Sequence, residues 1–209
     1  NSATSSGNTA YGGGVASQGA LTIAASAIVN NSTHGGVATW SGGGGIASMS
    51  GSTLLVQSST ISGNAALSDD ADGYAWGGGI AMWFGMPLQM TDSTVSGNQS
   101  TAPAGSYSGG IAASVVQIAN STVTLNTASG YGGGIVLYDA ASAKEISSTI
   151  IAGNTATGMP ASADLYSLVN PSIAGDHNLV IAGSGVTWAT DMPITTDPQL
   201  QALAFNGGP

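Results

Sequence analysis

The chain has 209 residues, of which 42% are hydrophobic and 5% are charged, and its single basic and 10 acidic residues give a formal net charge of -9. Because nucleic acids and anionic lipid surfaces bind clustered Lys and Arg, this balance argues against both as partners. The absence of cysteine excludes disulfides, thiolate metal sites and a cysteine nucleophile, and no apolar run reaches the roughly 18 residues of a membrane-spanning helix.

A repeated unit begins with an aromatic residue, glycines and an apolar residue. Its five copies read YGGGV, WSGGGGI, WGGGI, YSGGI and YGGGI, at residues 11–15, 40–46, 76–80, 107–111 and 131–135. Repeats at intervals of roughly 20 to 50 residues are typical of solenoids. The last residue of each copy is the first of three apolar anchors that follow one another in a fixed order.

The second anchor closes a short alternating segment, and the third anchor lies five residues later in every copy. The two sets are Ile23, Val56, Met90, Ile118 and Ile146, and Ile28, Ile61, Val95, Val123 and Ile151. Constant spacing indicates tight turns of a scaffold, whereas variable spacing indicates loops on one side. The sequence therefore predicts a variable face made of the loops 33–45, 65–76 and 99–108.

Each anchor lies in a short run of β-branched and polar residues, which indicates strands, and no longer stretch has helical periodicity. Stacked copies of such a unit predict an all-β fold, a single right-handed parallel β-helix with three short strands per turn and about six turns. We expect residues 1–169 to form the repeats. Residues 170–209 are expected to form an irregular C-terminal turn or cap of the same domain.

An asparagine follows the third anchor by three residues in every copy. The set comprises Asn31, Asn64, Asn98, Asn126 and Asn154. Asparagine tolerates the left-handed region at a bend, and its amide can bond the equivalent amide one turn away. We therefore predict a structural ladder at these positions.

The glycines suit a backbone that turns sharply into a strand and leaves no room for side chains. The aromatic residues before them are expected to form one column, since equal positions stack along a β-helix; they are Tyr11, Trp40, Trp76, Tyr107 and Tyr131. Three roles remain open for this column: the rings cover the bare glycine backbone, contact a glycan, or contact another copy of the protein.

The loop with Asp69, Asp70 and Asp72 offers oxygen ligands of the kind that Ca²⁺ prefers. The spacing is not that of an EF-hand, and no bidentate glutamate follows. A solvated acidic loop and a weak Ca²⁺ site are both consistent with it; no other cofactor is predicted.

No catalytic residue is predicted. A polysaccharide lyase needs cations near the uronate, and this chain offers only Lys144, beside Glu145. A glycoside hydrolase needs convergent carboxylates, whereas Asp92 and Glu145 are two turns apart. His34 and His177 are far apart in the repeat order, which gives no support to a Ser/His/Asp triad.

The motif S-T-I-x-G-N, then a loop, then G-G-G-I resembles the right-handed β-helix repeats of bacterial surface proteins, including polymorphic outer-membrane and autotransporter-like passengers. Residues 151–154, 164–165, 177–180, 197–200 and 203–209 look like the end of such a domain, where a "choice-of-anchor" segment follows. The resemblance covers essentially the whole chain. It implies a secreted protein held at the cell surface by a downstream anchor.

The expected function is that of a non-enzymatic extracellular structural or adhesive β-solenoid at a bacterial-type cell surface. The alternative is a polysaccharide-binding or polysaccharide-cleaving, pectin-lyase-like β-helix that uses the aromatic column, with Asp139 or Asp92 folded against it. The ends of a β-helix expose strand edges. These edges suggest either removed upstream turns or end-to-end self-association into a fibre.

Overall fold

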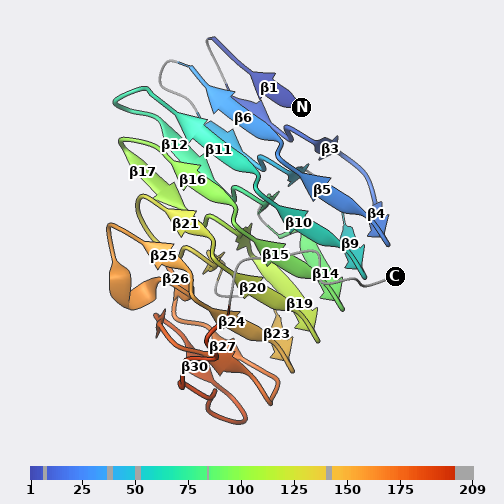
Figure 1. Ribbon diagram of the computed structural model, residues 1–209, viewed down its shortest axis with the longest axis vertical. Helices are drawn as coiled ribbons and strands as arrows, with labels where there is room; N and C mark the ends of the chain where they lie inside the picture. The colour runs from blue at the N-terminus through green and yellow to red at the C-terminus, as the bar shows by residue number, and fades with distance from the viewer. Residues whose placement is uncertain (7–8, 37–39, 50–52, 84, 140–142, 201–209) are drawn as a thin grey trace.

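The computed structural model describes residues 1–6, 9–36, 40–49, 53–83, 85–139 and 143–200. The chain coils into a parallel β-helix of about five turns, and every strand pair in it is parallel (Figure 1). Successive strands of one turn belong to different sheets, which we name A to E in chain order. The described residues form no helix that is long and apolar enough to cross a membrane.

Sheets A and B contain the first two strands of each turn. Sheet A consists of β1 (Ser2–Thr4), β6 (Ser32–Gly35), β11 (Ala65–Ser68), β16 (Gln99–Thr101), β21 (Thr127–Ala128) and β25 (Thr155–Ala156). Sheet B consists of β2 (Ala10–Tyr11), β7 (Trp40–Gly42), β12 (Tyr74–Trp76) and β17 (Gly105–Tyr107).

Sheets C, D and E enclose the core. Sheet C consists of β3 (Val15–Ser17), β8 (Ile46–Ser48), β13 (Ile80–Met82), β18 (Ile111–Ala113), β22 (Ile135–Leu137), β26 (Leu165–Ser167) and β29 (Gly183–Ser184). Sheet D consists of β4 (Leu21–Ala24), β9 (Leu54–Gln57), β14 (Pro87–Thr91), β19 (Val115–Ala119) and β23 (Lys144–Ser147). Sheet E consists of β5 (Ala27–Val29), β10 (Thr60–Ser62), β15 (Thr94–Ser96), β20 (Thr122–Thr124), β24 (Ile150–Ala152) and β28 (Leu179–Val180).

The C-terminal segment continues the coil in shorter pieces. A 3-10 turn, η1 (Pro160–Ser162), precedes β26, and β28 and β29 add a last strand each to sheets E and C. The strands β27 (Ser172–Ile173) and β30 (Thr187–Trp188) pair with each other. The predicted irregular segment 170–209 thus contains short strands as far as the structure describes it, to residue 200.

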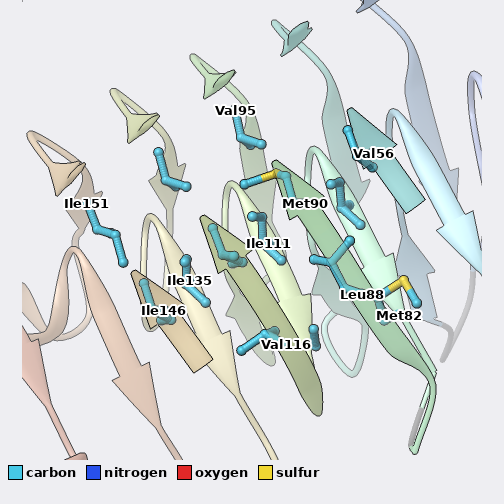
Figure 2. Close-up of a cluster of buried hydrophobic side chains, with 14 of the residues drawn as sticks. Val56, Met82, Leu88, Met90, Val95, Ile111, Val116, Ile135, Ile146 and Ile151 are labelled. Carbon is cyan, nitrogen blue, oxygen red and sulfur yellow. The ribbon is translucent and has the colours of Figure 1, made fainter. Parts of the chain in front are cut away.

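The three apolar anchors form the inward columns of sheets C, D and E. Ile46, Ile80 and Ile111 are paired in register, and all three are fully buried. The columns of the other two sheets face them, so one continuous hydrophobic core runs along the coil (Figure 2). Each turn places its apolar residues on those of the turn before, which removes both from water.

The prediction of three strands per turn is wrong, because full turns have five. The two missing strands, in sheets A and B, lie in the segments 33–45, 65–76 and 99–108 that were expected to be loops. Their inward residues are small, for example Ala66 and Ala75, which pack together. Ser41 in turn donates a hydrogen bond to Thr33 Oγ1 across the two sheets at 2.7 Å. Sheets A and B therefore form a thin flange whose inward positions hold no large apolar residue, so the alternation that would reveal its strands in the sequence is absent.

The triple glycines lie where this flange meets the core, a junction that we call the neck. Gly77 has φ +53°, in the left-handed region that glycine adopts without strain. A Cβ on Gly78 would lie 2.1 Å from the carbonyl oxygen of Gln99, and a Cβ on Gly79 would lie 3.1 Å from the Asn98 side chain. The first glycine is therefore needed for the turn and the next two for close approach.

The asparagines selected from the sequence form one buried hydrogen-bonded column on the other side of this neck. Asn64 Nδ2 donates to Asn98 Oδ1 at 2.9 Å, and Asn98 Nδ2 donates to Asn126 Oδ1 at 2.9 Å. The backbone N–H of Asn64 shares the same acceptor, Asn98 Oδ1, at 2.9 Å. The second amide proton of Asn98 goes to the carbonyl of Ile61. Each such amide is thus fully bonded although it is buried.

The column ends at an aspartate that sequence analysis did not assign to it. Asp164 Oδ1 accepts hydrogen bonds from Asn154 Nδ2 and the Asn154 backbone N–H, and its Oδ2 accepts one from the N–H of Ala182. At this last position the column needs only acceptors, which a carboxylate supplies. At the other end, Asn1 Nδ2 donates to Asn31 Oδ1 at 3.2 Å.

A second column stabilises the corner between sheets D and E. The Ser59 N–H donates to Ser93 Oγ and the Ser93 N–H to Ser121 Oγ, at 3.1 and 3.2 Å. The residue before each of these serines has a positive φ, as at Ser58 (46°) and Asn120 (48°). Serine hydroxyl groups therefore link successive turns at this corner, as asparagine amides do at the neck.

We expect Asn98→Ala to destabilise the fold by about 3 kcal/mol, because it leaves buried donors of Asn64 without an acceptor. The measurement is the urea midpoint followed by circular dichroism. The matched control is Gln99→Ala, whose side chain is exposed and bonds only Thr101 among the described residues, so its effect should stay within about 0.5 kcal/mol. Equal midpoints for the two variants would show that the column contributes little.

Candidate functional site

A half-buried strip of stacked rings follows the coil axis beside sheet B, and Trp40 is its most exposed member. Trp76 and Tyr107 have ring centroids 4.5 Å apart, and Tyr107 and Tyr131 have centroids 5.5 Å apart. Trp40 stacks on Trp76 at 5.3 Å, and Tyr166 stacks on Tyr131 at 5.2 Å. We call these five residues the aromatic strip.

The strip differs from the predicted column at its N-terminal end. Tyr11 pairs with Gly42, and Gly42 pairs with Trp76, so a glycine occupies the position where other turns have a ring. Trp40 is paired with Tyr74, two residues earlier in the register. The expectation that all five rings occupy equal positions is therefore wrong for Trp40, because the extra Ser-Gly in WSGGGGI shifts it.

Tyr11 leaves the stack as a consequence. Its ring lies over Gly42, where an added Cβ would be 3.3 Å from two Tyr11 ring carbons. Its edge meets Trp83, with centroids 5.8 Å apart and ring planes at 84°. Of the five predicted aromatic residues, Trp40, Trp76, Tyr107 and Tyr131 stack together and Tyr11 faces Trp83 instead.

The missing ring at Gly42 leaves a pocket with a volume of about 270 Å³ on the outer face of sheet C. Its walls on one side are Tyr11, Trp40 and Trp76, which come from sheet B. On the other side they are Met49, Trp83 and Tyr138, which follow strands of sheet C. The floor consists of Gly42 and the outward alanines of sheet C, with Thr9, Ser48 and Met82 completing the lining.

The pocket is closed at one end by larger side chains at the same register positions. The floor column runs Ala47, Ala81, Ala112 and then Val136. Val136 packs against Ala112 and Tyr138, and Trp76 lies edge-on to Tyr138 at 5.6 Å. Alanine thus keeps the groove open over three turns, and valine and tyrosine fill it in the next.

The pocket is apolar, uncharged and partly open to solvent. Trp40 is 39% exposed and Trp83 is 42% exposed, whereas Tyr138 is buried. None of the described residues in the lining is charged at neutral pH. Burial raises the pKa of Tyr138 and of Tyr11, which keeps both phenols neutral well above physiological pH. Such a site can hold a neutral ring by face contacts, and its described lining contains no carboxylate, imidazole or amine.

Sequence analysis missed Trp83, Tyr138 and Tyr166 as members of this site. Tyr166 follows Leu165 in β26, and only its pairing with Val136 shows that it belongs beside the strip. Trp83 and Tyr138 follow sheet C strands in segments without a repeated aromatic position. The sequence feature that could have indicated the pocket is the extra Ser-Gly of WSGGGGI, because it shifts Trp40 out of the column.

The structure does not gather the acidic loop residues into a metal site. Asp69 Oδ2 lies 2.9 Å from Nε2 of His34, and Asp70 Oδ1 accepts the Asp72 backbone N–H. Within the described part of the chain, no three His, Cys, Asp or Glu residues lie close enough to share a metal ion. The weak Ca²⁺ site stays a prediction without a supporting geometry.

Lys144 lies inside the coil and not in the pocket. It is paired with Val116, in the inward column that also contains Leu54 and Leu88. It is buried, and its Nζ donates a hydrogen bond to the carbonyl oxygen of Asp139. Burial lowers the pKa of the Lys144 ammonium, and the nearby Asp139 carboxylate opposes that shift.

The other candidate polar residues lie apart from the pocket. Asp92 is at a positive-φ corner between sheets D and E, Glu145 points outward from β23, and His177 occupies a corner equivalent to that of Asp92. None of them, and not Asp139, is among the described residues that line the pocket. The structure therefore does not bring the carboxylates together at the aromatic residues.

Comparison with known proteins identifies the family. Residues 1–176 match the family model described as "Right handed beta helix region", and the chain belongs to this family. The family fixes the architecture and the hand of the coil. Searches of curated proteins and of solved structures give no significant match.

We expect Lys144→Met to be more stable than the natural chain at pH 7 by about 1 kcal/mol, because a buried charge is replaced by an apolar side chain. A lowered pKa in the folded state means that protonation favours unfolding. The natural chain should therefore regain stability as pH rises through the lowered pKa towards the ordinary lysine value of about 10.4.

The measurement is the difference in unfolding free energy between Lys144→Met and the natural chain from pH 7 to pH 10, with Glu145→Gln as the exposed control. The difference should shrink as pH rises, and tyrosine titration cancels because both proteins contain the same tyrosines. A difference that is constant with pH would contradict the buried location of the ammonium.

Proposed function

We propose that the chain is a stiff, non-enzymatic structural and adhesive segment of an extracellular surface protein. The observation that carries this proposal is the unbroken asparagine column from Asn31 to Asp164. It binds each turn to the next at the neck, beside a continuous hydrophobic core. Such a coil resists bending and local opening, because every interior turn is held from both sides.

The placement of the basic residue supports an exposed, protease-rich location. Proteases of the trypsin class cleave after Lys or Arg, and the chain has a single residue of this kind, Lys144, which is buried. The resemblance of the repeats to bacterial surface passengers supports the same location.

End-to-end association of copies is part of this proposal. The strands β1 to β5 each lie at one end of their sheet and pair with a strand on one side only, as far as the structure describes the chain. A strand edge with unpaired N–H and C=O groups is a template for another chain. A head-to-tail contact of this kind repeats without closing and gives a fibre.

The pocket favours a second candidate function, that of a polysaccharide-binding β-helix. A lyase or hydrolase would need a cation or two carboxylates at the bound sugar. The described lining residues offer neither, whereas aromatic walls are suited to holding a neutral ring. This composition supports binding over cleavage.

Labelling of intact source cells with antibodies against the purified chain tests the surface location. We expect labelling of intact cells that a proteinase added outside diminishes. Labelling seen only after lysis would overturn the location, and the cytoplasmic proteins of the same cells serve as the control for integrity.

Digestion with two proteinases distinguishes resistance that comes from the rigid stacked turns from resistance that comes from the scarcity of lysine. Trypsin should leave the folded chain intact in either case, because Lys144 is buried. Proteinase K, which needs no basic residue, should also leave the coil intact for hours, with cuts confined to loops and termini. Rapid degradation by proteinase K alone would show that the resistance comes from composition and not from the stacked turns.

Negative-stain electron microscopy and size-exclusion chromatography test association. Filaments one coil wide that grow with concentration would support the head-to-tail contact. Dispersed short rods at all concentrations would contradict it and leave the structural role to single molecules.

A further inference from the structure

We propose that the pocket at Gly42 binds one neutral hexopyranose ring of a glycan. The proposal names the ligand for the adhesive part of the proposed function and rests on that part. The site is defined by the aromatic walls Tyr11, Trp40, Trp76 and Trp83 over a floor of glycine and alanine.

The pocket is a local exception in a regular surface. In the turns that follow, Trp76, Tyr107 and Tyr131 occupy equivalent positions and stack face to face, which leaves no space between them. At Gly42 the ring is missing, and the Tyr11 and Trp76 positions on either side of it are two turns apart, or about 10 Å. The register shift of this repeat turns Tyr11 across Gly42 to Trp83, while Trp40 stacks on Trp76 from a shifted position. The pocket is the space that remains between these rings and the outward alanines of sheet C.

The size and lining of this space match a single sugar ring. A volume of about 270 Å³ lies just below the usual range for drug-sized ligands, which begins at about 300 Å³. The apolar C–H faces of a pyranose pack against aromatic faces, and its hydroxyl groups point outward. Thr9 and Ser48 are polar residues of the lining, and Thr9 forms a side-chain hydrogen bond with Tyr11. A few polar groups among aromatic walls are the usual composition of a site that orients a small ligand.

Charge decides which class of sugar fits. The chain has a net charge of -9, and its one basic residue is buried inside the coil. A uronate or a sulfated sugar would meet a negative protein field with no cation to bind it. The pocket therefore selects neutral hexoses over the acidic polysaccharides that a lyase would take.

Two of the walls are held open before any ligand binds. Trp40 is fixed by stacking on Trp76 with ring planes 10° apart, and Trp83 is fixed by the Tyr11 edge at 5.8 Å. Both remain partly exposed, at 39% and 42%. Rings that are ordered in advance lose little side-chain entropy on binding, so a weak face contact is sufficient for measurable affinity.

The test is isothermal titration of the purified chain with cellohexaose, laminarihexaose, maltohexaose and mannohexaose, each to about 10 mM, with polygalacturonate as the charged comparator. We expect at least one neutral oligosaccharide to bind and polygalacturonate not to bind. The absence of binding by all four would overturn the proposal, whatever the surface labelling shows, so failure here and failure of the proposed location are separate results.

Three variants then locate the bound ring. Trp83→Ala removes a wall, and Gly42→Val fills the floor at a position where the nearest neighbour is a side chain, the Tyr11 ring, 3.3 Å from an added Cβ. Each should weaken binding at least tenfold. Tyr131→Ala removes a ring of the strip outside the pocket and should leave binding within about twofold. Circular dichroism establishes that each variant is folded.

Two outcomes would overturn the assignment of the pocket. Loss of binding in Tyr131→Ala with binding kept in Gly42→Val would place the sugar on the strip. A concentration-dependent elution volume that Trp83→Ala abolishes would assign the pocket to a second copy of the chain. Val29→Ala, which alters an exposed apolar residue on sheet E, is the control for nonspecific effects.

Discussion

The coil depends on one close contact, between the glycines that lead into the first five strands of sheet C and the asparagines that follow the first five strands of sheet E. A Cβ on Gly45 would lie 3.0 Å from the Asn64 side chain, and one on Gly44 would lie 2.3 Å from the carbonyl oxygen of Ala65. The backbone can pass this point only without side chains, and the amides beside it can stay buried only if all their hydrogen bonds are made. The two requirements explain why glycine triplets and asparagines recur together.

The same contact produces the surface that we assign to binding. The backbone reverses at a left-handed residue such as Gly77, so the residue just before it points outward, and rings at this position stack at the spacing of the turns. The neck positions accept only small residues, but the positions just outside the neck can carry different side chains. The shift at Gly42 is such a change: it alters the outer surface and leaves the paired strands and the core unchanged.

The sequence predicted the parts of the fold that carry large apolar residues or strict spacing. Ile61 and its equivalents, and Asn64 and its equivalents, follow one another at fixed distances, so the core columns and the amide column were visible before the structure. Sheets A and B were not, since strands with inward Ala66 or Ser106 have no hydrophobic signal. The pocket was not predicted either, because it depends on which residue pairs with Trp76, and pairing across a shifted repeat is set by three-dimensional register.

The most direct test of this account is hydrogen exchange at the asparagine side-chain amides, followed residue by residue in amide NMR spectra. The Nδ2 protons of Asn64, Asn98 and Asn126 are buried and doubly bonded, whereas Asn120 is exposed at a corner. The account predicts that the three buried amides exchange orders of magnitude more slowly than that of Asn120, and together, because they open with the coil. Exchange of all four at the rate of an exposed amide would contradict the central role of the asparagine column.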